Sequence, residues 1–175
     1  MKFDQSSAIC QVFVFREGLL SVLGHDLRIK VTSFVIEIDE AYAIEARFDA
    51  RSLQVDCAMV DGAERPDVLS LADKNEIDRN ILRKVLESDI YGDISLTSAL
   101  VRKEDSSYLV NSTLTLHGTS KQIAFTVRKE GNYNVADFGL HLPDFGITPF
   151  SALFGMIKIK PDILIRVMIP DGPAV

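Results

Sequence analysis

The stretch from residue 108 to residue 130 constrains the fold more than any other, because two alternating runs flank a short turn there. The apolar side chains fall on alternate positions: Tyr108, Val110, Leu114 and Leu116 before the turn, and Ile123, Phe125 and Val127 after it. Successive side chains of a β-strand point to opposite faces, so this pattern predicts two half-buried strands joined as an antiparallel hairpin. Gly118 supplies the positive backbone angle that a tight turn needs.

Strand-like patterns follow one another along most of the chain. In addition to the hairpin, we predict strands over residues 9–16, 26–39, 43–55, 94–102, 132–142, 157–159 and 163–169. Within 26–39 the apolar positions change from odd to even numbers near Thr32, which indicates a β-bulge or a tight corner between strands. Strands of this number and spacing favour an antiparallel barrel or a sandwich.

One segment carries a helical pattern instead of an alternating one. Apolar residues recur at helical spacing over residues 73–87, and acidic residues occupy the first turn: Ile77, Ile81, Leu82, Val85 and Leu86 form the apolar set. We therefore predict a helix over Asp73–Glu87 that packs its apolar face against the sheet. A single helical turn is predicted over Pro149–Phe154.

Length and composition narrow the class of protein. A chain of 175 residues with 47% apolar and 25% charged residues can bury a sizeable core, and we expect residues 1–175 to form a single domain. The net charge of -6 disfavours nucleic acid and anionic membrane surfaces as partners. No window approaches the roughly 20 apolar residues of a membrane span, so we expect none.

The first residues, MKFDQSSAIC, contain no apolar run of signal-peptide length. This predicts a cytoplasmic protein. A protein whose signal peptide had been removed would have the same start and would be periplasmic.

Few residues carry obvious chemistry. Cys10 and Cys57 have neither metal-ligand nor redox-pair spacing, so we interpret them as reduced thiols that act as small apolar residues. The histidines form no metal-binding motif, and we predict no metal site. Asp26 follows His25 directly and could orient its imidazole ring, as a carboxylate does beside a catalytic histidine.

Three segments together resemble the YceI-like family. LTLHGTSKQIAFTV (residues 114–127) is similar to the family's signature hairpin, although Gln122 stands where proline is usual. DRNILRKVLESDIYGDISLTS (78–98) is similar to its helix-to-strand segment, with Gly92 in place of proline. DFGITPFSALFGMIKIKPDILIRVMI (144–169) resembles its closing segment, and LGHDLRI (23–29) resembles a Gly-His start found in part of the family.

This resemblance implies an all-β fold, an antiparallel eight-stranded lipocalin-like barrel with one or two short helices. It also implies that the interior holds a long apolar molecule, which is a polyisoprenoid in some members. We therefore expect no cofactor other than a bound lipid or isoprenoid.

Strand parity yields a set of candidate residues for the lining of such a cavity: Phe13, Phe15, Leu27, Ile29, Ile44, Phe48, Ala50, Leu96, Val110, Leu114, Phe125 and Val127. His25 and Asp26 are the candidates for orienting a polar group of the ligand. The inward-facing positions also include Ala46, Ser98 and Ser112, and this mixture of bulky and small residues favours an apolar cavity over a filled interior.

The leading hypothesis is a binding protein that sequesters a long-chain apolar or amphipathic ligand in the barrel. One alternative is an enzyme or redox module that uses His25 and Asp26 at the barrel mouth. The other is a filled barrel that acts through its surface, as a homodimer or as the partner of another protein.

Overall fold

The computed structural model of the protein describes residues 1–17, 25–152, 154 and 157–172. Its strands in chain order are β1 (Lys2–Asp4), β2 (Ile9–Val14), β3 (Arg16–Glu17), β4 (Asp26–Val31), β5 (Phe34–Ile38), β6 (Ile44–Asp49), β7 (Leu53–Val60), β8 (Ala63–Arg65), β9 (Asp93–Glu104), β10 (Ser107–Leu116), β11 (Thr119–Glu130), β12 (Tyr133–His141), β13 (Ser151–Ala152), β14 (Ile157–Ile159) and β15 (Asp162–Pro170). Its helical segments are η2 (Ala50–Ser52), α1 (Leu71–Asn80), η3 (Ile81–Val85) and η4 (Leu142–Phe145).

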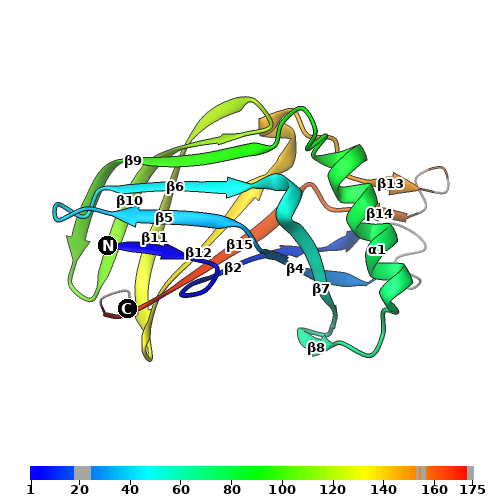
Figure 1. Cartoon of the computed structure of the whole chain (residues 1–175), viewed down its shortest axis with the longest axis horizontal. Helices are drawn as coiled ribbons and strands as arrows, with labels where there is room; N and C mark the ends of the chain where they lie inside the picture. Colours follow the sequence, from blue (N-terminus) through cyan, green and yellow to red (C-terminus); the bar gives the residue numbers. More distant parts are fainter. Residues whose placement is uncertain (18–24, 153, 155–156, 173–175) are drawn as a thin grey trace.

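Twelve of these strands form one antiparallel sheet in the order β1-β5-β6-β9-β10-β11-β12-β15-β2-β4-β7-β8. β4 continues into β5 through a corner, and β6 continues into β7 through η2. Because β4 pairs with β7 and β5 pairs with β6, these two bent strands pair with each other on both sides of their corners. They connect the β9 side of the sheet to the β2 side, and the sheet curls into a barrel (Figure 1).

The predicted antiparallel lipocalin-like fold is confirmed. The number of strands differs from the expected eight: the main sheet has twelve, of which β4 with β5 and β6 with β7 are the halves of two bent strands. The short strands β1 and β8 add to the sheet at its two ends. β3, β13 and β14 form a separate three-stranded sheet.

The corner near Thr32 is where the sequence places it. Thr32 Oγ1 donates a hydrogen bond to the carbonyl oxygen of Ser52 at 2.9 Å, and the Ser33 N–H donates to Ser52 Oγ at 3.0 Å. The corners of the two bent strands are thus hydrogen-bonded to each other. The inward-facing positions change from odd numbers in β4 to even numbers in β5, as the change of parity predicts.

The central hairpin forms in the predicted register. β10 pairs with β11 from Ser107 opposite Arg128 to Leu116 opposite Thr119. His117 and Gly118 make the turn with φ of 52° and 71°, so the predicted positive angle at Gly118 is confirmed. The even-numbered residues of β10 from 110 to 116 are buried and face the interior of the barrel.

The helical segment begins earlier and is less regular than predicted. α1 starts after Ser70, whose side chain forms a reciprocal capping box with Asp73, and the following five residues, η3, adopt π-helical geometry. The segment covers one end of the barrel (Figure 1). The helical turn predicted over Pro149–Phe154 is wrong, because Ser151 and Ala152 form strand β13.

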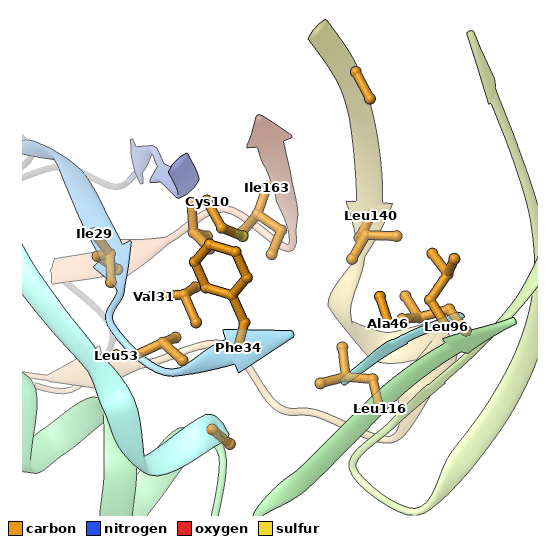
Figure 2. Close-up of a cluster of buried hydrophobic side chains, with 14 of the residues drawn as sticks. Cys10, Ile29, Val31, Phe34, Ala46, Leu53, Leu96, Leu116, Leu140 and Ile163 are labelled. Atoms are coloured by element: carbon orange, nitrogen blue, oxygen red, sulfur yellow. The ribbon is translucent and has the colours of Figure 1, made fainter. Parts of the chain in front are cut away.

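The core lies inside the curled sheet. Figure 2 shows Phe34 of β5 beside Cys10, Val31 and Ile163, and a second group across the interior made by Ala46, Leu96, Leu116 and Leu140. Every one of these side chains is buried, so apolar area from distant strands is removed from water at one place. No helix in the described part of the chain combines the length and apolar character needed to cross a bilayer.

Candidate functional site

An inner cavity of about 160 Å³ lies within the barrel. Its described lining residues are aliphatic, aromatic or, at Cys10, a thiol, and they come from both halves of the sheet. Ala46, Leu96, Leu116 and Leu140, which converge in Figure 2, all border it. The barrel is therefore partly hollow, and a molecule inside this cavity would contact apolar side chains.

An outer cavity of about 460 Å³ lies at the end of the barrel covered by α1. Ile77, Ile81 and Val85 border it on the helical side, and Ala152 and Ile159 of the three-stranded sheet border it as well. Unlike the inner cavity, it also has polar side chains on its wall: His25, Asp73, Glu76 and Asn80. The outer cavity can thus accept both an apolar chain and a polar group.

The predicted packing of the helix against the barrel is confirmed, and its apolar face also borders the outer cavity. None of the residues of α1 and η3 is fully buried, because the apolar face of the segment packs against the core on one side and borders the outer cavity on the other. Leu86, directly after η3, is the residue of this segment that reaches the core, at 8% exposure.

The structure brings most of the sequence-predicted cavity residues to one of the two cavities. Ile44, Phe48, Leu96, Leu114, Phe125 and Val127 border the inner cavity. Leu27, Ile29 and His25 border the outer cavity. Geometry places these residues where a ligand could contact them, and their role in binding stays a prediction.

Four predicted cavity residues border neither cavity. Phe13 lies directly opposite Arg28 on the outer face of the barrel, while its neighbours Val12 and Val14 face the cavities. Phe15 has the same parity as Phe13 and lies beyond the end of β2. The parity prediction for β2 was therefore wrong, because this strand is apolar on both faces.

Ala50 and Val110 are buried, both at 0% exposure, yet neither borders a cavity. Ala50 lies in η2, at the corner of a bent strand, where its N–H donates to the carbonyl oxygen of Gly92 at 2.8 Å. Val110 faces inward within the hydrophobic core cluster. The barrel is thus filled at these positions and hollow at others.

Asp26 has a structural contact of its own, and its role in orienting His25 stays a prediction. Asp26 Oδ1 accepts a hydrogen bond from the backbone N–H of Arg16 at 2.8 Å, so this carboxylate fixes the start of β3 to β4. In the described ranges, no three histidine, cysteine or acidic side chains come close enough together to hold a metal ion.

Sequence reasoning missed one wall of the inner cavity. Ala136, Phe138 and Leu140 of β12 border it, together with the odd-numbered residues of β15 from 163 to 169. The alternation in β12 could have identified its residues. In β15 nearly every side chain is apolar, so parity alone does not distinguish the inner face.

Charged side chains gather on the outside of the barrel. Arg166 Nε and Nη2 donate to the two oxygens of Asp137 at 2.7 and 2.8 Å, and Arg128 Nη2 also donates to this carboxylate at 2.7 Å. The hydrogen bonds from Arg166 and Arg128 lower the pKa of Asp137, against the opposing effect of burial. This cluster ties β11, β12 and β15 together without reaching the cavities.

The thiols behave as apolar groups. Cys10 and Cys57 are both free and buried, as predicted. Cys10 borders the inner cavity, where burial raises the pKa of its thiol to about 12. It therefore adds to the apolar wall and is a poor nucleophile.

Comparison with known proteins gives one family and several similar folds. A model of the YceI-like domain matches residues 11–169. Burkholderia cenocepacia BcnA has a similar structure, with a TM-score of 0.65 and 12% identity over 95% of this chain and 97% of that one. No curated protein sequence matches the chain.

Two further solved structures share the fold. A polyisoprenoid binding domain from Saccharophagus degradans implicated in plant cell wall breakdown has a TM-score of 0.51 and 12% identity, over 93% of this chain and 94% of that one. The Campylobacter jejuni YCEI protein also has a TM-score of 0.51, with 14% identity over 84% of this chain and 86% of that one.

Proposed function

Because this chain belongs to the YceI-like domain family, we propose that it binds a long-chain apolar or amphipathic molecule, of the isoprenoid or fatty-acyl type, inside its barrel. The inner cavity carries this proposal, because its described wall offers apolar contact and no charged side chain. A polar or charged molecule would lose its hydration there without compensation, whereas a hydrocarbon chain would not.

The binding energy would come mainly from burial of apolar area. Each methylene group moved from water to such a site contributes about 0.8 kcal/mol, so affinity should rise steeply with chain length. The few polar side chains on the outer cavity would then orient one end of the molecule rather than supply most of the affinity.

The similar folds support the same class of ligand. One of them is described as a polyisoprenoid binding domain. No separate cofactor is proposed beyond the bound molecule itself.

Native mass spectrometry of freshly purified protein tests the proposal. We expect a mass increment that disappears when the protein is denatured and extracted with organic solvent, and an extract that contains a long-chain apolar molecule. The same spectrum gives the subunit number and so also tests the alternative in which the protein acts as a homodimer.

A second measurement guards against loss of the ligand during purification. The extracted and refolded protein is titrated with a fluorescent fatty-acyl or isoprenoid probe, with fully unfolded protein as the control. Absence of both a native ligand and probe binding would contradict the proposed function.

A further inference from the structure

Leu86 lies between the two cavities. We propose, resting on the function proposed above, that Leu86 decides how far a ligand chain extends from the outer cavity into the inner one, and so sets the chain length that the protein accepts.

The two cavities adjoin across a shared set of side chains. Five described residues border both cavities: Val12, Leu53, Leu86, Leu142 and Ile163. A chain that fills both cavities must therefore pass between these side chains. They form the partition of the site, and their bulk controls whether the cavities are joined.

Four members of the partition are held by the barrel. Val12, Leu53 and Ile163 belong to β2, β7 and β15, whose backbones are hydrogen-bonded to neighbouring strands. The N–H of Leu142 donates to the carbonyl oxygen of Pro161 at 2.9 Å. Displacing any of these side chains by moving its backbone would disturb the sheet or the turn that follows it.

Leu86 is the member that comes from the helical segment. It is the one buried residue between Leu71 and Glu87, and Ile77, Ile81 and Val85 before it are only partly buried and border the outer cavity. The segment is attached to the barrel through partly buried side chains and is not a strand of the sheet, so moving it breaks no strand pairing. Leu86 is therefore the part of the partition best placed to move aside for a chain.

The local backbone directs Leu86 into the partition. Its N–H donates to the carbonyl oxygen of Ile81 at 2.9 Å, which is the five-residue spacing of a π-turn, a geometry often found at functional positions. Glu87 follows with φ of 45°, an unusual value for a residue with a side chain, and Glu87 Oε2 lies 3.2 Å from His117 Nε2. The contact with the hairpin turn holds Glu87, so Leu86 would move aside by a change of its side-chain rotamer or of the segment before it.

The chemistry of the two walls sets the orientation of the ligand. The described wall of the inner cavity is apolar, whereas Asp73, Glu76 and Asn80 stand on the wall of the outer cavity. A hydrocarbon tail would enter the inner cavity and the polar end would remain in the outer cavity, because the reverse would bury a polar group without a partner. The inferred ligand is a single-chain amphiphile that is longer than the outer cavity alone can hold.

A series of straight-chain fatty alcohols tests this role. Binding is measured by displacement of a fluorescent fatty-acyl probe from the parent protein and from Leu86→Phe, Leu86→Ala and Leu82→Ala. Leu82 is the matched control, because it lies in the same helical segment, is half-buried and borders neither cavity.

For the parent we expect affinity to rise about fourfold per added methylene, the equivalent of about 0.8 kcal/mol, until both cavities are filled. In Leu86→Phe this rise should stop at a shorter chain, because the larger ring closes the passage. In Leu86→Ala the rise should extend at least as far as in the parent, with faster association of the longest alcohols. Leu82→Ala should follow the parent.

A folded Leu86→Phe variant with the parental chain-length limit would overturn the inference. If Leu86→Phe does not fold, as judged by circular dichroism and thermal unfolding, Leu86→Ala decides: an unchanged association rate for long alcohols also overturns it. Failure of the proposed function is distinguishable, because then no alcohol and no probe would bind the parent protein.

Discussion

Ala46 and Ala50 offer a matched pair of substitutions that separates a hollow barrel from a filled one. Both alanines are buried, at 5% and 0% exposure, and they lie four residues apart on one bent strand. Ala46 borders the inner cavity, whereas Ala50 lies at the corner and borders neither cavity. Replacing each with leucine adds three carbon atoms, which at position 46 enter the inner cavity and at position 50 enter a close-packed part of the interior.

The structure gives the size of the expected effects. At about 24 cal/mol per Å³, an empty cavity of 160 Å³ lowers the free energy of unfolding by about 4 kcal/mol relative to a close-packed interior. The added carbon atoms of Ala46→Leu would recover about 2 kcal/mol of this, at about 0.8 kcal/mol each, and imperfect fit would offset part of the recovery. Ala50→Leu has no such space and should lose about 1–3 kcal/mol to overpacking.

Thermal unfolding of ligand-free protein compares the two variants. For a chain of this length, a change of 1 kcal/mol shifts the Tm by about 2–4 °C, so Ala46→Leu should remain within about 4 °C of the parent or exceed it. Ala50→Leu should fall by about 2–12 °C.

Probe binding should show the reverse order. The new side chain of Ala46→Leu takes the place of about three ligand methylenes, which would weaken binding by about 2.4 kcal/mol, or roughly fiftyfold. Ala50→Leu should keep the parental affinity while it is folded. Equal losses of stability in the two variants, or unchanged probe affinity in Ala46→Leu, would refute the assignment of the inner cavity as a ligand site.

Three further predictions follow from particular residues. Gly118→Val should lower the free energy of unfolding by about 1–3 kcal/mol in chemical denaturation, because valine is strained at a φ of 71°; an unchanged midpoint would contradict this. The lowered pKa of Asp137 contributes stability above the unfolded-state pKa of about 3.9, and this stability is lost as the pH falls through the lower folded-state pKa. Acid titration of unfolding should therefore be steeper for the parent than for Asp137→Asn, and equal slopes would count against a contribution from Arg166. Cys10 and Cys57 should resist alkylation by iodoacetamide at mildly alkaline pH in the native protein and react after unfolding, whereas rapid native labelling would show that they are accessible.

The sequence by itself determined the local architecture. Alternation with a period of two predicted the central hairpin, and the change of parity near Thr32 predicted the corner, because side-chain direction along a strand depends only on position within it. The positive φ of Gly118 followed in the same way from the turn between the two runs. These features rest on interactions between residues close in sequence.

Which face of a strand meets the cavity required the tertiary structure wherever both faces are apolar. In β2 the pairing with β4 and β15 places Val12 inside and Phe13 outside, and neither neighbour is predictable from β2 alone. The same holds for β15, whose odd-numbered residues face the cavity. Pairing between strands far apart in sequence decides such cases.

The partition of the site was likewise a product of the fold. The helical pattern identified Leu86 as apolar but gave no reason to separate it from Ile81 or Val85. The π-helical end of the segment and the reversal at Glu87 send Leu86 into the core, while Ile81 and Val85 face the outer cavity. A cavity is bounded by side chains from many elements at once, so its walls are defined only when long-range packing has brought those elements together.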